Sequence, residues 1–409
     1  MGRPETIAAP VATYPDLATL LARVPALAAE LAEGAAEREL ARELPFAGFA
    51  RFRASGLAAL RLPAALGGPG GRPSDVIAVI ADLAAAEPNL AHALRSHFNF
   101  TEGLALDPEQ PKAALHAGRI LRGALYAGAH TELGTPKPGE VTTRLRRDGD
   151  GFRLDGRKFY ATGTAFADYG SFSALDDDGA FVSALLPVDR KGITVLDDWD
   201  GMGQRMTASG GVLFEGVRVE PGEVETRTMS NQIGRHQSTL RQLHLCACSV
   251  GIVRNLLAEA TAYVRGPARA AAHSAVATAA ADPFIQKAIG EIAARSYALD
   301  ALIAEAARAL DRTAAALAGD GEDAESALIA SSLATARTQL VAGQLALEAA
   351  QGMFEAGGAS ATARRYNFDR HWRNIRTILN HNPLAQKARV VGDYVLNGTT
   401  DYLKEGRVF

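Results

Sequence analysis

Apolar residues recur at helical spacing in two long parts of the chain. The first part runs from about residue 16 to 118 and contains DLATLLARVPALAAELAEGAAERELA and VIAVIADLAAAEPNLAHAL. The second contains three long amphipathic segments, at 242–264, 283–317 and 326–354. Apolar positions three and four residues apart predict helices that pack one face against a core. We therefore expect an N-terminal helical region and a C-terminal antiparallel helical bundle.

Between these parts the hydrophobic pattern changes. The stretch GEVTTRLRRDGDGFRLDGRKFYATG alternates polar and apolar residues around glycine-rich turns, and AFVSALLPV and GGVLFEGVRV are rich in strand-forming residues. Such alternation with turn signals predicts strands joined by tight turns. The sequence thus predicts an α+β protein with three domains: a helical domain at 1–119, a β-domain at 120–226 and a helical bundle with a C-terminal active-site segment at 227–409.

One glycine- and proline-rich stretch interrupts the N-terminal helices. The sequence LRLPAALGGPGGRPSD, residues 60–75, is typical of a loop. Ser74 or Asp75 is the expected N-cap of the helix that follows, because short polar side chains accept hydrogen bonds from the first free backbone N–H groups of a helix. The loop is expected to separate two helical layers.

Composition narrows the class of protein. The 409 residues are 47% hydrophobic, which is typical of a globular protein, and the net charge of -3 provides no basic field for nucleic acid or an anionic membrane. The N-terminal segment lacks the pattern of a signal peptide, and no apolar run approaches the ~20 residues of a membrane span. We expect a cytoplasmic protein with no nucleic-acid or membrane partner. Cys246 and Cys248 are two residues apart, too close in a helix for a disulfide, and are expected to be reduced core residues.

Several common catalytic motifs are absent from the sequence. There is no G-x-G-x-x-G, no Walker lysine loop, no H-E-x-x-H and no C-x-x-C pair. The sequence therefore has no recognisable binding motif for a nicotinamide nucleotide, and no metal site is expected. A G-x-S-x-G elbow is also missing, so serine hydrolase chemistry lacks its landmark.

The segment from Arg370 to Gly392 contains no carboxylate. It reads RHWRNIRTILNHNPLAQKARVVG, with basic residues, amides and rings only. Together with LPAALGGPGG, GAHTELGT, GRKFYATGTAFAD, MGQRMTASGGVLFEGVRV and AAQGMFEAGGAS, in this order, it resembles the acyl-CoA dehydrogenase superfamily. The C-terminal string DRHWRNIRTILNHNPLAQKARVVGDYVLNG is most similar to the flavin-dependent monooxygenase branch, the dibenzothiophene monooxygenase-like enzymes.

The resemblance implies a fold and a cofactor. It implies an N-terminal helical domain, a central β-barrel domain and a C-terminal four-helix bundle, assembled as a homotetramer, with flavin between the β-domain and the bundle. It also implies a two-component monooxygenase, which uses O2 and reduced flavin, FMNH2 in preference to FADH2, from a separate NAD(P)H:flavin reductase. Through a C4a-(hydro)peroxyflavin the enzyme would oxygenate a small substrate at sulfur, nitrogen or an aromatic carbon.

His381 is the expected catalytic residue. Dehydrogenases of this superfamily need a carboxylate base, which many of them carry in this segment, and a positioned base contributes roughly a hundred- to ten-thousand-fold in rate. In the monooxygenases the resemblance places His381 toward the flavin instead, where an imidazole can exchange protons near neutral pH. Asn382 would orient the ring and line the pocket, or only form the turn before Pro383. A histidine that merely caps a helix end is the alternative for His381.

Two more aromatic side chains are expected at the substrate pocket on the N-terminal side. The resemblance places His97, in RSHFNFTEG, on a helix that lines the pocket, where it would bond substrate or peroxide. Phe100 is expected in the pocket wall. A core role is the alternative for both residues. Trp199, in LDDWDGMGQ, is either a pocket residue or an anchor of the β-domain core.

Further residues are expected to bind the flavin. Thr131 and Thr162 match family threonines at the pyrimidine edge and at N5, and Thr162 is also expected to help catalysis. Tyr160 stands where dehydrogenases carry a tryptophan beside the ring, and His130 departs from the family pattern. Gly357 and Gly358, which let backbone approach a phosphate, and Arg370 complete the expected set. Arg370, like Arg364 and Arg365, would pair either with that phosphate or with carboxylates at a subunit contact.

Two alternative functions stay open on sequence grounds. One is an acyl-CoA dehydrogenase whose base lies outside residues 370–392, and the other is a noncatalytic flavin-binding protein.

Overall fold

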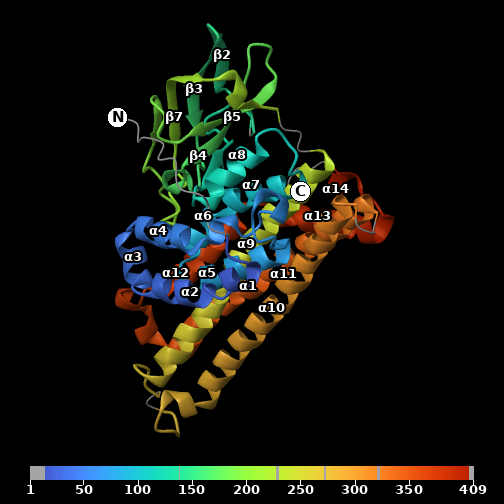
Figure 1. Cartoon of the computed structure of the whole chain (residues 1–409). Helices are drawn as coiled ribbons and strands as arrows, with labels where there is room; N and C mark the ends of the chain where they lie inside the picture. Colours follow the sequence, from blue (N-terminus) through green and yellow to red (C-terminus); the bar gives the residue numbers. More distant parts are fainter. Residues whose placement is uncertain (1–13, 138, 227–229, 271–272, 320–322, 405–409) are drawn as a thin grey trace.

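The computed structural model describes residues 14–137, 139–226, 230–270, 273–319 and 323–404. Short helices form the N-terminal part, an eight-stranded sheet follows, and three long helices dominate the C-terminal part. Figure 1 shows the sheet above the N-terminal helices and the long helices running diagonally below them. The α+β fold class is confirmed.

The N-terminal helices form two groups on either side of the expected loop. The first group is α1 (Leu17–Leu21), α2 (Val24–Ala32), α3 (Ala35–Ala41) and α4 (Phe46–Ser55), and the second is α5 (Pro73–Ala86), α6 (Pro88–Ala93), α7 (Arg95–Leu106) and α8 (Ala113–Leu121).

Helix α5 begins two or three residues earlier than its sequence suggests. Pro73 is its first residue and Arg72 is the N-cap, whereas Asp75 accepts a hydrogen bond from the backbone N–H of Arg72. The expectation that Ser74 or Asp75 is the N-cap was therefore wrong. Proline is favoured at the first helical position because it needs no donor there and its φ angle is already helical.

The central sheet contains the eight strands. They are β1 (Tyr126–Ala129), β2 (Arg144–Asp148), β3 (Gly151–Lys158), β4 (Tyr169–Leu175), β5 (Phe181–Pro187), β6 (Ile193–Val195), β7 (Val212–Val219) and β8 (Val224–Glu225). Their order is β6-β7-β3-β2-β4-β5-β8, and β1 pairs in parallel with β4. The sheet encloses its own core, which includes Leu154, Phe172 and Phe214.

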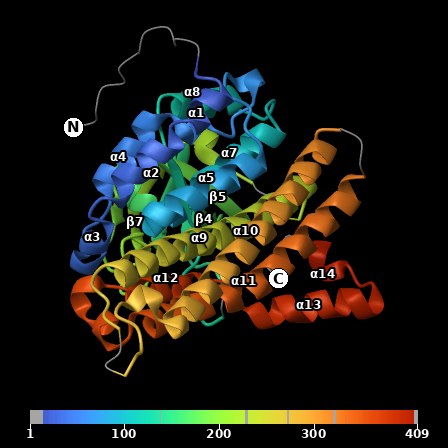
Figure 2. The ribbon, with the colours of Figure 1, turned by 90° about the horizontal axis from the view of Figure 1, so that it is seen from below.

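The C-terminal part contains α9 (Gln232–Arg265), α10 (Pro283–Leu317), α11 (Ala324–Gly357), α12 (Asp369–Leu379), α13 (Leu384–Asn397) and α14 (Asp401–Lys404). The first three are the long antiparallel helices of the bundle, and α12 and α13 pack against α11 (Figure 2). One continuous core joins this bundle to the N-terminal helices. The proposed domain boundaries stay predictions: residue 119 lies in the last turn of α8, and residue 227 lies outside the described residues.

Helix α9 lies at the centre of the molecule. It packs against α5, α7, α10, α11 and α12, and Cys246 and Cys248 are buried, unpaired thiols on it, as expected. Among the described residues, α9 alone is long and apolar enough to cross a membrane, and 61% of its most apolar window is buried inside the protein. The expectation of an amphipathic helix was wrong for α9, because neighbours cover it on several sides.

Candidate active site

The turn between α12 and α13 presents His381 to the start of α7. Nη2 of Arg95, the first residue of α7, lies 3.0 Å from Nε2 of His381, and Nδ1 lies 2.9 Å from Oδ1 of Asn382. A guanidinium can only donate hydrogen bonds. Nε2 therefore accepts from Arg95, and Nδ1 carries the proton that is donated to Asn382.

This arrangement keeps His381 neutral. The positive charge of Arg95, with the surrounding protein atoms, lowers the pKa of His381 to about 3. The side chain is exposed in the isolated chain, although both ring nitrogens have partners. The site therefore offers a neutral imidazole with an accepting Nε2.

A second histidine, His92, lies close to the same arginine. Its Nδ1 is 2.9 Å from Oε1 of Gln204, and because an amide oxygen can only accept, Nδ1 is the donor. Burial, followed by the charge of Arg95, lowers the pKa of His92 to about 3. The His92 Nε2 and Gln204 Nε2 atoms are buried without a hydrogen-bond partner. Buried polar atoms of this kind are usually satisfied by a bound group or by water.

Gln204 is held in place from three sides. Its backbone N–H donates to Oδ1 of Asn374 on α12, at 2.6 Å, and its carbonyl accepts from the Trp199 indole at 2.8 Å. A Cβ on the preceding Gly203 would lie 2.0 Å from the Arg373 carbonyl oxygen, so only glycine allows this close approach to α12. Gln204 itself has a φ of 51°, a conformation that costs free energy and often occurs at functional sites.

A chain of hydroxyl groups orients Thr162. Thr207 Oγ1 donates to the Gln204 carbonyl at 2.8 Å, so its hydrogen is used there. Ser209 Oγ, 2.6 Å from Thr207 and 2.7 Å from Thr162, must then donate to Thr207 and accept from Thr162. Each hydroxyl has one hydrogen to donate. Thr162 is thus left with only acceptor capacity toward the site.

Two aromatic rings lie beside this hydroxyl chain. Tyr160 is 49% exposed and has a φ of 56°, and its ring centroid is 6.1 Å from that of Trp199 in an edge-to-face arrangement. A large ring held outward by an unusual backbone conformation suits a planar ligand. Trp199 is half-buried, and its indole N–H donates to the Gln204 carbonyl. The side chain therefore stabilises the loop that carries Gln204 and also forms part of the surface beside Tyr160.

Thr131 and His130 lie at the end of β1 with exposed side chains. The Thr131 carbonyl accepts from the backbone N–H of Phe159 at 2.8 Å, and the His130 carbonyl accepts from Ser173 at 3.1 Å. The first contact brings β1 next to the Phe159–Thr162 segment. Their role toward flavin stays a prediction.

His97 and Phe100 lie elsewhere, in the core between α7 and β1. Nε2 of His97 donates to the Ala58 carbonyl at 2.7 Å, and Nδ1 accepts from the Tyr126 backbone at 3.3 Å. Phe100 stacks on Tyr126 with centroids 4.1 Å apart. Both ring nitrogens of His97 are engaged, and burial lowers its pKa to about 4. This placement favours the core role for both residues.

The glycine turn after α11 holds the backbone in a shape that other residues avoid. Gly358 has φ 61° and ψ -165°, and a Cβ on Gly357 would lie 2.5 Å from that of Ala361. Arg370 pairs with Glu259, and also donates to the Asn367 carbonyl at 3.0 Å. Glu259 lies on α9 of the same chain, so this ion pair is neither of the two contacts expected for Arg370, the flavin phosphate or a carboxylate at a subunit contact. Arg364 and Arg365 stay exposed.

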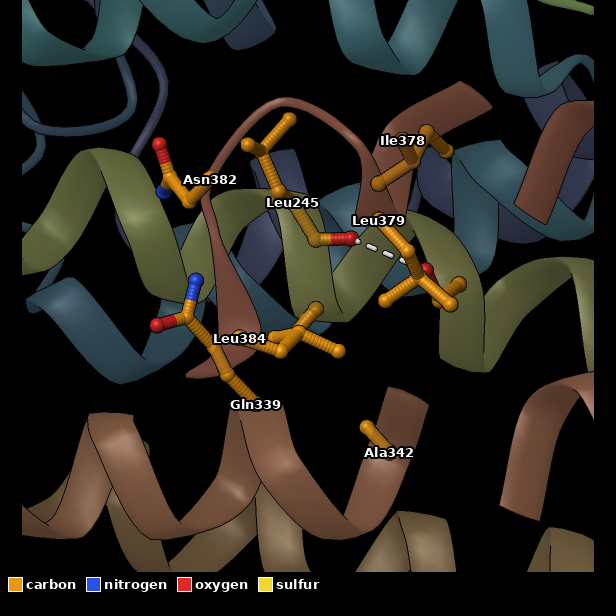
Figure 3. A pocket seen from close by; sticks show the side chains of 9 residues that line it. Leu245, Gln339, Ala342, Ile378, Leu379, Asn382 and Leu384 are labelled. Carbon is orange, nitrogen blue, oxygen red and sulfur yellow. Dashed lines mark hydrogen bonds between the residues drawn. The ribbon is translucent and has the colours of Figure 1, made fainter. Parts of the chain in front are cut away.

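A small cavity adjoins the His381 turn. Asn382, Gln339 and Cys246 are among the residues that line it, and its volume of about 10 Å³ fits about one water molecule. Figure 3 shows Asn382 on the turn, above Gln339 of α11. The Gln339 Oε1 atom is buried without a hydrogen-bond partner. No group of three metal-binding side chains occurs in the part of the chain that the structure describes.

The sequence singled out His381, Asn382, Thr162, Tyr160 and Trp199, whose roles stay predictions, and it did not single out His92, Arg95 and Gln204. The fold and these contacts define an acyl-CoA dehydrogenase-like protein with a neutral imidazole in place of an acid in its C-terminal segment.

Comparisons with known proteins specify the branch. Residues 243–386 match the family model of the acyl-CoA dehydrogenase C-terminal domain. The probable FMNH2-dependent monooxygenase SfnC of Pseudomonas putida is 30% identical over 398 residues, covering 95% of this chain and 97% of the relative. The FMN-bound structure of TdsC, a dibenzothiophene monooxygenase from Paenibacillus sp. A11-2, aligns with TM-score 0.84 and 29% identity over 93% of this chain and 98% of that chain.

A second solved structure agrees. Methanesulfinate monooxygenase MsuC from Pseudomonas fluorescens aligns with TM-score 0.83 and 29% identity over 93% of this chain and 97% of that chain. The chain belongs to the flavin-dependent monooxygenase branch of the acyl-CoA dehydrogenase superfamily. The predicted family, fold class and enzyme class, an oxidoreductase, are confirmed.

Proposed function

We propose that this protein uses reduced FMN and O2 to oxygenate a small molecule at a soft heteroatom, with sulfur as the preferred atom. The observation that carries the proposal is the neutral His381, fixed between Arg95 and Asn382 where many dehydrogenases carry an acid. The name of SfnC and the FMN-bound structure of TdsC support FMN as the cofactor. The names of TdsC and MsuC support sulfur compounds as substrates.

The residues of the site fit a flavin ring. Thr162 presents an acceptor, which suits the N–H that a reduced flavin carries at N5. Tyr160 and Trp199 provide a ring-sized aromatic wall, and the exposed Thr131 pairs through its backbone with Phe159, the residue before Tyr160. Arg370 does not fit the phosphate, since Glu259 holds it, so Arg364 and Arg365 are the cations that we assign to that end of the cofactor.

Bound reduced FMN supplies the electrons that split O2, so that one oxygen atom enters the substrate and the other leaves as water. When Arg95 releases Nε2, the largest cause of the low pKa of His381 is removed, and the ring can accept a proton there and return it, while Asn382 holds Nδ1–H. The charge of Arg95 stabilises negative charge that develops beside it. Tyr160 and Trp199 exclude water from the reacting atoms.

A separate NAD(P)H:flavin reductase would supply the reduced FMN, because the sequence has no nicotinamide-binding fingerprint. The proposal includes a cytoplasmic location and the homotetramer that the resemblance implies. Exposed apolar side chains on α10, Phe284 at 80% and Tyr297 at 79%, are suited to a contact between subunits.

The ion pairs of the buried and half-buried carboxylates argue against a dehydrogenase base outside residues 370–392. Glu39, Glu102, Glu132 and Glu259 are each bonded to cationic side chains, and their pKa values are lowered although burial opposes the shift. Such carboxylates are poor general bases near neutral pH. Glu87 has a raised pKa because of burial, but one of its oxygens is bonded to Asn89 at the start of α6.

The proposal is tested with the purified chain, a flavin reductase, FMN, NADH and O2. Dibenzothiophene, methanesulfinate and indole are offered as substrates. We expect oxygenated product in place of hydrogen peroxide, and about a hundredfold less product with His381→Asn. The matched control, His273→Asn, alters an exposed histidine and should keep full activity.

Anaerobic mixing with acyl-CoA provides the opposing outcome. Bleaching of bound oxidised flavin by acyl-CoA would identify a dehydrogenase and contradict the proposal. An absence of flavin binding in equilibrium dialysis would instead favour a noncatalytic protein.

A further inference from the structure

A buried lysine lies behind the His381 turn. Lys387, on α13, has no solvent-exposed surface, and its Nζ donates to Oε1 of Gln242 on α9. Burial lowers the pKa of Lys387 to about 7. Both the ammonium and the neutral amine carry N–H groups, so the bond to Gln242 persists through that titration.

Gln242 links this lysine to the turn. Its Oε1 also accepts from Nδ2 of Asn382, at 3.4 Å, and Oδ1 of the same asparagine accepts from Nδ1 of His381. The hydrogen bonds thus run from Lys387 through two amides to the imidazole. Gln242 and Asn382 are both buried, at 5% and 6% exposure, so water does not replace these contacts readily.

The donors at the two ends of this chain fix the orientation of every group between them. Arg95 makes Nε2 an acceptor, and Lys387 makes Oε1 of Gln242 face α13. Asn382 must then turn Nδ2 toward Gln242 and Oδ1 toward His381. A flip of Asn382 would place its NH2 group against the Nδ1–H of His381 and leave that donor unpaired.

We propose that Lys387 is a positioning residue: acting through Gln242 and Asn382, it holds His381 in the Nδ1–H tautomer, including when Arg95 releases Nε2. The proposal deepens the proposed function, since the accepting Nε2 is the atom assigned to proton transfer. Arg95 lies on α7 and the lysine chain on α9 and α13, so the two supports reach the ring from opposite ends.

The test reads the tautomer of His381 directly, without flavin. Ring nitrogens of histidine labelled with ¹⁵N are observed by NMR at pH 8, and the His381 signals are assigned by their loss in His381→Asn. In Arg95→Gln, the lysine chain should still hold the Nδ1–H tautomer. In Arg95→Gln with Lys387→Met, the share of Nε2–H tautomer relative to Nδ1–H should rise about tenfold, the effect of one lost hydrogen bond.

Three further variants in the Arg95→Gln background separate positioning from general damage. Gln242→Glu keeps an acceptor for both neighbours and should keep the tautomer, whereas Gln242→Leu should lose it. Lys287→Met removes an exposed lysine and should change nothing. The Gln242 pair decides the matter if Lys387→Met fails to fold.

Equal tautomer ratios with and without Lys387, or with Glu and Leu at position 242, would overturn the proposal. The result does not depend on catalysis. A wild-type chain that holds the tautomer but forms no product would contradict the proposed function alone.

Discussion

Arg95 acts on three imidazoles at the junction of α6, α7, α9 and α12. Its charge lowers the pKa of His381 as the largest cause, and it adds to burial at His92 and His244. Burial lowers the pKa of Arg95 itself to about 10, so the guanidinium stays charged near neutral pH. No described carboxylate forms an ion pair with it, and the site therefore carries a net positive charge at this point.

Replacement of this charge should give His381 a titration that the wild-type chain lacks. In Arg95→Gln, we expect the pKa of His381 to rise from about 3 toward the ordinary value of about 6.5. The ring then takes a proton as the pH falls through that range, and product formation should fall with it. Rate profiles from pH 5 to 9 measure this change. Arg95→Lys keeps a positive charge, so its rate of product formation should not fall between neutral pH and pH 5. Parallel rate profiles for the wild-type chain, Arg95→Gln and Arg95→Lys would contradict this effect of the Arg95 charge.

The hydroxyl chain predicts a preference between the two redox states of flavin. Ser209→Ala removes the group that accepts from Thr162, so the Thr162 hydroxyl can turn and donate to the N5 of oxidised flavin. Oxidised FMN should then bind several-fold more tightly relative to reduced FMN, by roughly the contribution of one hydrogen bond. Fluorescence titration and the reduction potential of bound FMN measure the ratio. Ser326→Ala, at an exposed serine of α11, should leave it unchanged.

Local sequence patterns pointed to some residues of the candidate site and not to others. A catalytic role for His381 was predicted from the resemblance of its acid-free segment to the monooxygenase branch, whereas the Asn382-Pro383 turn taken alone favours a histidine that caps a helix end. His92 lies in an apolar stretch, PNLAHAL, where a lone histidine is usually a core residue. Its importance depends on Gln204, which is 112 positions away, and on the end of α6 just before Arg95. His97 had the more suggestive local context, but lies in the core.

The contact between α5 and α9 depends on one glycine. A Cβ on Gly251 of α9 would lie 2.2 Å from the Ala81 carbonyl oxygen and 2.7 Å from the Ala84 Cβ. The helices approach closely there because no side chain intervenes. This contact places α9, with Gln242 and Cys246, against the N-terminal helices that carry His92 and Arg95.

Two Gly→Ala substitutions in helix interiors should therefore have opposite effects. Gly251→Ala forces α5 and α9 apart and should lower the free energy of unfolding by about 1–3 kcal/mol. Gly290→Ala on α10 meets no atom within 4 Å and should raise it by about 1 kcal/mol, through helix propensity alone. Urea unfolding of both variants measures the difference. A stabilising Gly251→Ala would show that the helices separate at little cost.

The sequence predicted which segments form helices and strands better than it predicted where a helix begins or how deeply a helix is buried. The alternation around DGDG predicted β2 and β3, and helical spacing predicted the three long helices. The start of α5 was missed because Pro73 outweighs the capping preference of Ser74. The central position of α9 follows from packing on several sides, which the spacing of its own apolar residues does not show.

At the scale of the whole molecule, the site joins all three parts of the chain. Arg95 and His381 are 286 positions apart, and Gln204 and Asn374 are 170 apart. Such pairs cannot be derived from local patterns, because they depend on how the helical parts and the sheet pack together. The family resemblance supplied the general location of the site, and the structure adds which side chains meet there.

The buried histidines make the whole fold sensitive to acid. His92, His97 and His244 have pKa values of about 3, 4 and 3, chiefly because burial disfavours the charged ring. Each pKa lies below the unfolded value of about 6.5. The folded chain therefore binds fewer protons than the unfolded chain. The stabilisation is present above pH 6.5 and is lost as the pH falls.

The loss should begin well before the carboxylates titrate. As the pH falls below 6, each of these histidines lowers the free energy of unfolding by about 1.4 kcal/mol per pH unit, so the three together lower it by about 4 kcal/mol per unit. The paired carboxylates Glu102 and Glu259, with pKa values of about 2, weaken the fold only below about pH 4.3. Urea unfolding at pH 7, 6 and 5, at fixed protein concentration, should show an uptake of at least three protons. His97→Gln should reduce that uptake by one, and a stability that stays flat from pH 7 to 5 would contradict the neutral state of these rings.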